Sequence, residues 1–251
     1  DLATSGGNIT VQAGGQVDIN HVVIESNGGN IQIQGGDLTQ HIHSGVYIHQ
    51  GSRVDAGTGT VNIVGHSAGT SGVVIQDAVT LGGTTHLTGV TPVSNANGVV
   101  MDSAVITGTG ALNIAGQATG SSSGHGIALL GTTLQDRNAP ITLTGSTAGD
   151  GSGVVIRQSG GTRSAIANSG SLTITSGGGG VSIQSLSTLP PVKLAANGIT
   201  IGSTTTNADD VGISNADIQS TGGDLVVNAV SGGVGISDSV LKNTGTGNTK
   251  V

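Results

Sequence analysis

Short runs in which apolar and polar residues alternate recur along the whole chain. Nine such runs, of which "ITVQA", "VNIVG" and "LTITS" are examples, begin at Ile9, Ile31, Val61, Thr85, Leu112, Ile141, Leu172, Ile199 and Leu225. Alternation with a period of two places every second side chain on one face and predicts half-buried β-strands. Gly, Asn and Ser fill the intervals, which favours tight turns over helices. The pattern therefore predicts an all-β fold.

A second series of apolar triplets, typified by "GVVI", recurs independently of the first. The residue before each triplet is His21, Gly45, Gly72, Gly98, Gly126, Gly153, Gly180, Gly212 or Gly235. In both series, successive members are on average about 27 residues apart. Two markers with one mean period indicate one repeating unit.

A unit of this length cannot bury its apolar face alone, so consecutive units are expected to stack. Short strands, no helices and this period predict a parallel β-helix of about nine turns, in which residues 1–251 form a single segment of a longer shaft. Neighbouring rungs are roughly 4.8 Å apart, which makes the rod about 40 Å long. A β-sandwich or barrel is the competing fold, but it needs frequent hairpin turns and does not account for the in-phase repeat.

Within each triplet strand, the first and third residues are predicted to point inward and form aliphatic ladders. These pairs are Val22 and Ile24, Val46 and Ile48, Val73 and Ile75, Val99 and Met101, Ile127 and Leu129, Val154 and Ile156, and Val181 and Ile183. In the last two units the third position is Asn215 and Asp238. Either the register shifts there or the core becomes polar.

The second residue of each triplet is expected to point outward. It is Val23, Tyr47, Val74, Val100 and Val155 in five of the units. One interpretation is an exposed apolar stripe that serves as an interaction surface. The other is that β-branched residues suit strands and that loops partly cover them. Tyr47 is the one member able to stack on a sugar ring.

Composition narrows the class of protein. The chain has 47 Gly, no Cys, Phe or Trp, and a net charge of −7. Abundant aliphatic residues and low charge argue against disorder, and the absence of Cys excludes a disulfide framework. Seven scattered Lys and Arg residues argue against nucleic acid as a partner. No run is long enough to span a membrane, and the first residues lack the features of a secretory signal.

Few residues have the spacing of a chemical site. His41, His43 and His49 are close in sequence, but without neighbouring acidic residues they indicate a solvated surface rather than a metal site. The segment "GSSSG" at 120–124, followed by His125, matches a nucleophile motif. It lies in a loop between strands, whereas that motif needs a strand before it and a helix after it. No catalytic, cofactor-binding or metal-binding residue is therefore predicted.

Two alternatives remain open. Asp77 and Asp102 on successive turns, the adjacent Asp209 and Asp210, and Arg157 and Arg163 further along would suit a polysaccharide-binding or polysaccharide-cleaving β-helix. Such a protein would use aromatic platforms, and Tyr47 is the only one available. The last alternative is a self-assembling or ice-facing surface based on Thr58 with Thr60 and Thr107 with Thr109, although Thr-x-Thr does not recur in every turn.

The units "GNITVQAGGQVDI", "GTGTVNIVG" and "SGSLTITSGGG" resemble the shaft repeats of filamentous-haemagglutinin-like exoproteins, and the resemblance covers practically the whole chain. These are large Gram-negative surface proteins exported by two-partner secretion, and they include adhesins and the stalks of contact-dependent inhibition toxins. The family's secretion domain carries Asn-Pro-Asn motifs. The nearest string here, "SNANGVV" at 94–100, has Ala96 in place of proline, so the export domain is not expected within this chain.

The resemblance implies a right-handed β-helix that is secreted or held on the outer surface of a bacterium. It implies an outer-membrane transporter for the parent protein, and a receptor or glycan on a host or neighbouring cell. The expected role is a non-catalytic structural and adhesive shaft that presents a binding or toxic tip. Unpaired strands at the two ends would also allow head-to-tail self-association into fibres.

Overall fold

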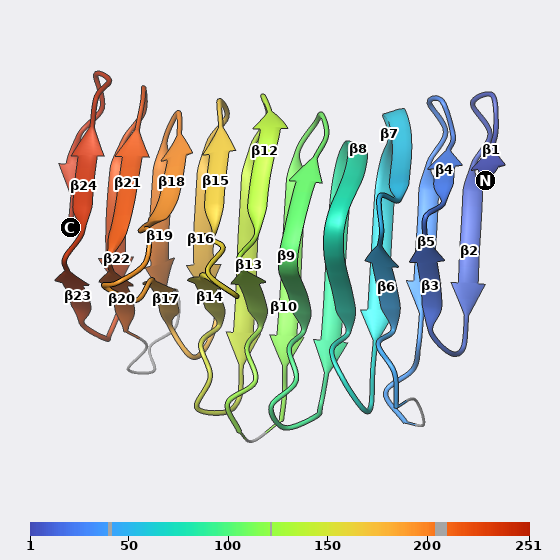
Figure 1. Cartoon of the computed structure of the whole chain (residues 1–251), viewed down its shortest axis with the longest axis horizontal. Helices are drawn as coiled ribbons and strands as arrows, with labels where there is room; N and C mark the ends of the chain where they lie inside the picture. Colours follow the sequence, from blue (N-terminus) through green and yellow to red (C-terminus); the bar gives the residue numbers. More distant parts are fainter. Residues whose placement is uncertain (40–41, 121, 204–209) are drawn as a thin grey trace.

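The computed structural model describes residues 1–39, 42–120, 122–203 and 210–251. Within these ranges the chain forms strands and no helix, and all pairings between strands are parallel. Successive turns lie side by side along one long axis, from the N-terminus at one end to the C-terminus at the other (Figure 1). The predicted parallel β-solenoid is confirmed, whereas its right-handed sense stays a prediction. The described residues contain no helix able to cross a membrane.

Each turn contributes to three stacks of strands. The first stack contains the alternating runs, all in the predicted register. It comprises β2 (Ile9–Ala13), β5 (Ile31–Gly35), the end of β7 (Arg53–His66), the end of β8 (Val73–Thr91), β10 (Leu112–Ala118), β13 (Ile141–Thr147), β16 (Leu172–Ser176), β19 (Ile199–Ser203), β22 (Leu225–Ala229) and β25 (Thr249–Lys250).

The second stack contains the triplet strands. It comprises β3 (Val17–Asn20), β6 (Val46–His49), the start of β8, the start of β9 (Val99–Thr107), β11 (Ile127–Leu130), β14 (Val154–Arg157), β17 (Val181–Gln184), β20 (Val211–Ser214) and β23 (Val234–Ser237). These nine rungs enclose eight complete turns, and the step from Val17 to Val234 averages about 27 residues. The predicted period is therefore confirmed.

The third stack has no repeated phrase in the sequence. It comprises β1 (Leu2–Ala3), β4 (Val23–Glu25), the start of β7, the middle of β8, the end of β9, β12 (Thr133–Arg137), β15 (Ala165–Asn168), β18 (Val192–Ala196), β21 (Ala216–Ser220) and β24 (Val240–Asn243). Long strands β7, β8 and β9 bend from one stack into the next, so the three stacks form one continuous sheet.

The predicted aliphatic ladders form the core. From Val46 and Ile48 to Val181 and Ile183, every predicted inward pair is buried. Each buried aliphatic side chain contributes roughly 1.5 to 3 kcal/mol to folding, so this ladder is the main source of stability.

Two assignments at the ends of the triplet series were wrong. Val22 and Ile24 belong to the corner and the third stack, and the second-stack rung is Val17 with Ile19 instead. Near the C-terminus the register shifts by one residue, so that Val211 and Ile213 continue the ladder and the core stays aliphatic.

A left-handed residue explains both errors. At the corner between the second and third stacks, one residue per turn has a φ of about +50° to +63°, namely His21, Gln50, Asp77, Ser103, Gly131, Asn215 and Asp238. Asn, Asp, His and Gly adopt this conformation most readily. His21, Asn215 and Asp238 are therefore turn residues, and each lies outside the aliphatic ladder.

The corner between the first and second stacks is narrow because glycines face each other across it. The facing pairs are Gly35 and Gly45, Gly65 and Gly72, Gly89 and Gly98, Gly116 and Gly126, and Gly145 and Gly153. A Cβ atom on the first member of each pair would overlap the carbonyl oxygen of the second. These close approaches account for part of the unusual glycine content. At the next rungs Ser176 and Ser203 replace the first glycine, and both are buried.

Candidate functional site

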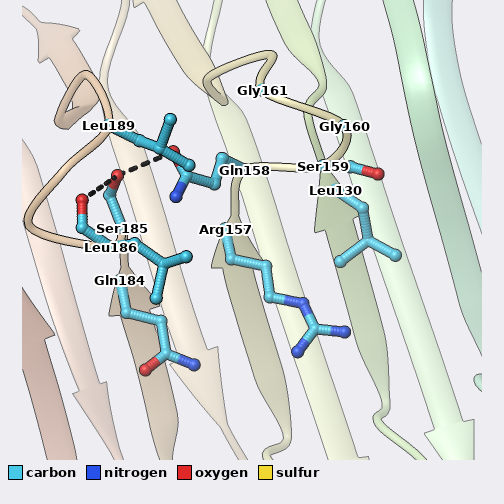
Figure 2. Close-up of a pocket in the computed structure, with 10 residues that line it drawn as sticks. All are labelled: Leu130, Arg157, Gln158, Ser159, Gly160, Gly161, Gln184, Ser185, Leu186 and Leu189. Carbon is cyan, nitrogen blue, oxygen red and sulfur yellow. Dashed lines mark hydrogen bonds between the residues drawn. The ribbon is translucent and has the colours of Figure 1, made fainter.

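Two consecutive turns depart from the regular corner between the second and third stacks. After β14 and after β17, the single left-handed residue is replaced by loops 158–164 and 185–191. Because β14 and β17 are neighbours in the stack, the two loops lie on adjacent rungs. They enclose the candidate site, a cavity of about 410 Å³ that Figure 2 shows from outside.

The cavity has an apolar part and a polar part. Leu130, Leu186 and Leu189 supply the apolar surface, and Leu186 is 67% exposed. Arg157 and Gln184 occupy equivalent positions on adjacent rungs, one after the other. The Arg157 side chain extends between Leu130 on one side and Gln184 with Leu186 on the other (Figure 2). A cation is thus placed against leucine side chains.

Arg157 has no anionic partner within the described part of the chain. The ion pairs found there involve other groups, such as Arg53 with Glu25 and Asp55. No described carboxylate lies within ion-pair distance of Arg157, whose side chain is exposed. Its charge is available to a ligand.

Gln158 supplies a buried amide with an unused hydrogen-bonding atom. The hydroxyl of Ser185 lies 2.8 Å from Gln158 Oε1 and 2.8 Å from the carbonyl oxygen of Pro190. Gln158 Nε2 is buried and has no hydrogen-bond partner. The Ser185 hydroxyl has only one hydrogen, so in either orientation of the amide one polar atom of Gln158 stays unpaired. A buried unpaired atom of this kind costs about 1–3 kcal/mol, which a ligand would recover.

The lining residues have no Asp, Glu or His among them. They offer one positive charge, amide and hydroxyl hydrogen bonds, and apolar surface. This combination is suited to binding rather than to proton transfer, because general acid–base catalysis needs a group that titrates near the working pH.

The predicted stripe is only partly a row in the structure. Tyr47, Val74 and Val100 lie on successive rungs of the second stack and are half-buried, and Val155 is in the same row beyond Ala128. Val23 was wrongly included, because the chain turns at His21 and Val23 pairs with Arg53 in the third stack. The use of this row as an interaction surface stays a prediction.

Exposure along the row also differs from the expectation. Val155 is 1% exposed. It is flanked by Ala128 and Ser182 on the adjacent rungs and by Arg157 on its own strand. The row is therefore not a continuous apolar surface.

Tyr47 is held by neighbouring side chains. Its ring stacks on that of His49, with centroids 4.1 Å apart, and its hydroxyl donates a hydrogen bond to Gln76 Oε1. Burial, and then the negative charges of Asp77 and Asp18, raise the pKa of Tyr47. His49 Nε2 in turn lies 2.9 Å from Asp18 Oδ1.

The histidine cluster gives no metal site in the described part of the chain. His43 is exposed, His49 is buried, and His41 lies outside the described residues. Among the described residues, no group of three or more His, Cys, Asp or Glu side chains is arranged to hold a metal ion.

Two predicted acidic residues do lie on adjacent rungs. Gln76 pairs with Asp102, and Asp77 follows at the left-handed corner position. Asp77 therefore has a structural reason to be there. Asp210 accepts a hydrogen bond of 2.6 Å from the backbone N–H of Gly233, and Asp209 lies outside the described residues.

His125, next to the "GSSSG" segment, connects neighbouring turns. Its Nδ1 accepts a 2.9 Å hydrogen bond from the backbone N–H of Ser152, and its own N–H donates to Asn97 Oδ1 at 2.9 Å. Burial, and then the positive charge of Arg157, lower the pKa of His125. The ring is thus engaged as a neutral acceptor. Ser121 of the same segment lies outside the described residues.

The proposed threonine surface does not form at its predicted positions. Thr58, Thr60, Thr107 and Thr109 lie near corners. Thr142 and Thr144 do stack on Thr173 and Thr175 in the first stack, but the next rung has Gly202 in line with Thr175.

Sequence reasoning missed the cavity, although two signals mark it. "SGGTRS" at 159–164 and "SLSTLPPV" at 185–192 interrupt the alternation with paired Gly and paired Pro, both of which favour loops. It also missed Arg137, a buried cation that donates to the carbonyl oxygens of Leu81, Thr109 and Gly110.

Comparisons with known proteins return no relative: no family model, no curated protein and no solved structure matches this chain. A functional proposal therefore rests on the sequence pattern and on the geometry described above.

Proposed function

We propose that this chain is a segment of a non-catalytic shaft of a bacterial surface exoprotein, outside the cell, where it presents a binding or toxic tip. The observation that supports the proposal is the unbroken ladder of parallel strands from β1 to β25. Every inner rung is hydrogen-bonded to the rung before and the rung after it, so bending the rod would stretch backbone hydrogen bonds in all three stacks.

The dimensions suit a spacer. Eight turns at roughly 4.8 Å per turn span about 40 Å, and each further unit would extend the rod by the same step. Stability in such arrays is a sum over units and their interfaces, so length can grow without a new core design. Repetition of one unit is an economical way to build reach.

The proposed partners follow from the resemblance of the repeats. They are a receptor or glycan on a host or neighbouring cell, an outer-membrane transporter for the parent protein, and other copies of the shaft through head-to-tail contacts. A polysaccharide-binding or polysaccharide-cleaving β-helix remains the alternative. Against it, Asp77 serves as a corner residue and the ring of Tyr47 is stacked on His49.

Removal of one complete turn tests the spacer role. Deletion of residues 99–126 joins Gly98 to Ile127, which reproduces the natural Gly126–Ile127 junction, because Val99 and Ile127 are in register. The chain has no Cys, so single cysteines introduced at the exposed positions Gln12 and Ser237 can carry a dye pair. The distance between the dyes should fall by roughly 5 Å in the deletion variant.

The matched control removes half a unit. Deletion of residues 99–111 would join the first stack directly to itself and leave one turn without its second and third strands. We expect loss of cooperative unfolding in this variant and retention in the full-unit variant. An unchanged dye distance after the full deletion would refute the shaft. Release of reducing ends from an acidic polysaccharide by the intact chain would instead support the enzymatic alternative.

A further inference from the structure

We propose that the cavity between loops 158–164 and 185–191 binds a carboxylate that carries a branched aliphatic group beside it. Two sources share this chemistry, a free aliphatic acid of amino-acid size and the C-terminal residue of a peptide. The inference goes beyond the shaft role, since it gives the side of the rod a binding site of its own. Its failure would leave the spacer proposal untouched.

The charge of Arg157 calls for an anion. The guanidinium is exposed at the cavity and is not ion-paired with any described carboxylate, in a chain whose net charge is −7. A guanidinium presents two parallel N–H groups that match the two oxygens of a carboxylate. The negative charge of the rest of the chain would disfavour anions elsewhere, so binding should be confined to this cation.

The three leucines call for an aliphatic group. Leu186 projects into solvent from loop 185–191, and with Leu130 and Leu189 it forms the apolar part of the cavity. None of the three is aromatic, so the surface matches a branched alkyl group better than a flat ring or a sugar. Burial of a group of leucine size removes apolar surface from water on both partners.

The amides call for a polar group between the two. Gln158 has one buried polar atom without a partner, and Gln184 lies one rung from Arg157. The peptide-like amide of an acylated amino acid has both a donor and an acceptor, so it can pair with Gln158 in either orientation of that side chain. Carboxylate, amide and alkyl group then each have a counterpart.

The size of the cavity limits the ligand. A volume of about 410 Å³ is at the lower end of the range of small-molecule sites, which is about 300–1,000 Å³. It accommodates one residue and not a folded partner. The space is open between the two loops, so a peptide could continue outward from its last residue.

N-acetyl-leucine is the probe, titrated into the intact chain and followed by the backbone NMR signals of the two loops. We expect saturable shifts with a dissociation constant of roughly 1–10 mM, typical of a ligand this small in an open site. N-acetyl-leucine amide lacks the carboxylate and should bind at least about tenfold more weakly. Equal binding of the acid and the amide would overturn the proposal.

Matched variants locate the site. Arg157→Gln should weaken binding of N-acetyl-leucine about tenfold or more, whereas Arg163→Gln removes the same charge from the neighbouring loop, outside the cavity lining, and should have little effect. Leu186→Ser should also weaken binding, and Leu38→Ser, at an exposed leucine far along the rod, should not. Both leucines are exposed, so neither change threatens folding. Equal effects within either pair would overturn the proposal.

Further arms separate the two sources. A tripeptide, N-acetyl-Ala-Ala-Leu, that binds several-fold more tightly than N-acetyl-leucine identifies a peptide end, because the added residues contact the loops. Equal affinity identifies a free acid of amino-acid size. Saturable shifts of the same loops with galacturonate, combined with none for N-acetyl-leucine, would replace the aliphatic acid by a sugar acid and overturn the proposal.

Discussion

A single methyl group at Gly116 should disrupt the rod, because this residue has no room for a side chain. Gly116 is buried in β10 and faces Gly126 across the narrow corner. A Cβ atom there would lie 2.6 Å from the carbonyl carbon of Gly126 and 2.8 Å from Cγ1 of Ile127. Carbon atoms in contact are normally about 3.5–4.0 Å apart. The two segments would therefore have to separate by about 1 Å.

That separation cannot stay local. Gly116 pairs with Gly89 on one side and with Gly145 on the other, and both neighbours make the same close approach. Overpacking of a well-filled core usually costs 1–3 kcal/mol, and where backbone rather than a side chain must move we expect the upper end, about 3 kcal/mol. Gly116→Ala should therefore lower the midpoint of urea unfolding clearly.

The control is Gly212→Ala in β20. Gly212 is also a strand glycine between two paired rungs, but nothing lies within 4 Å of its Cβ position and its φ is not positive. Alanine there should leave stability unchanged or raise it by about 0.5–1 kcal/mol, because the unfolded chain loses conformational freedom. Circular dichroism in urea compares the two variants. If Gly116→Ala is as stable as Gly212→Ala, the close approach does not explain the glycine pairs.

Two further changes test the contacts between turns. Arg137→Met should destabilise the rod by about 2–3 kcal/mol, because three carbonyl groups lose a charged donor; a melting temperature equal to that of the exposed-site variant Arg163→Met would contradict this. Burial lowers the pKa of Arg137 only to about 10, so it stays charged at neutral pH. His125→Asn should make stability less dependent on pH. The folded-state pKa of His125 is lowered, so the unfolded chain binds more protons below about pH 6.5, and the intact rod loses stability as the pH falls through that range. Asn97 already holds the equivalent backbone N–H one rung earlier, which makes Asn a conservative replacement; parallel pH–stability curves for the two proteins would rule the role out.

Periodicity in the sequence was sufficient to predict two of the three stacks. The alternating runs and the triplets carry their own register, because each has a Val or Ile at every inward position of a thin core. The third stack escaped notice. Its strands, such as β4 and β15, are short and share no phrase, since a rung of three to five residues needs only one or two inward aliphatic side chains.

Corner geometry decided what periodicity left ambiguous. "VDIN" at 17–20 and "VVIE" at 22–25 both read as strands, and only the left-handed φ of His21 shows that the chain turns between them. The same conformation at Asn215 and Asp238 settled the register of the last turns. Backbone dihedral angles of this kind depend on the rungs above and below, and the residue types alone do not determine them.

The alternation of apolar and polar residues by itself determined the solenoid, its period and its aliphatic core, because the hydrophobic effect acts on a pattern that repeats every turn. Only the tertiary structure decided where a ligand can bind. Leu130, Arg157 and Leu186 are separated by about 27 residues at each step, and they meet because stacked turns bring equivalent positions together while two unpredicted loops close over them.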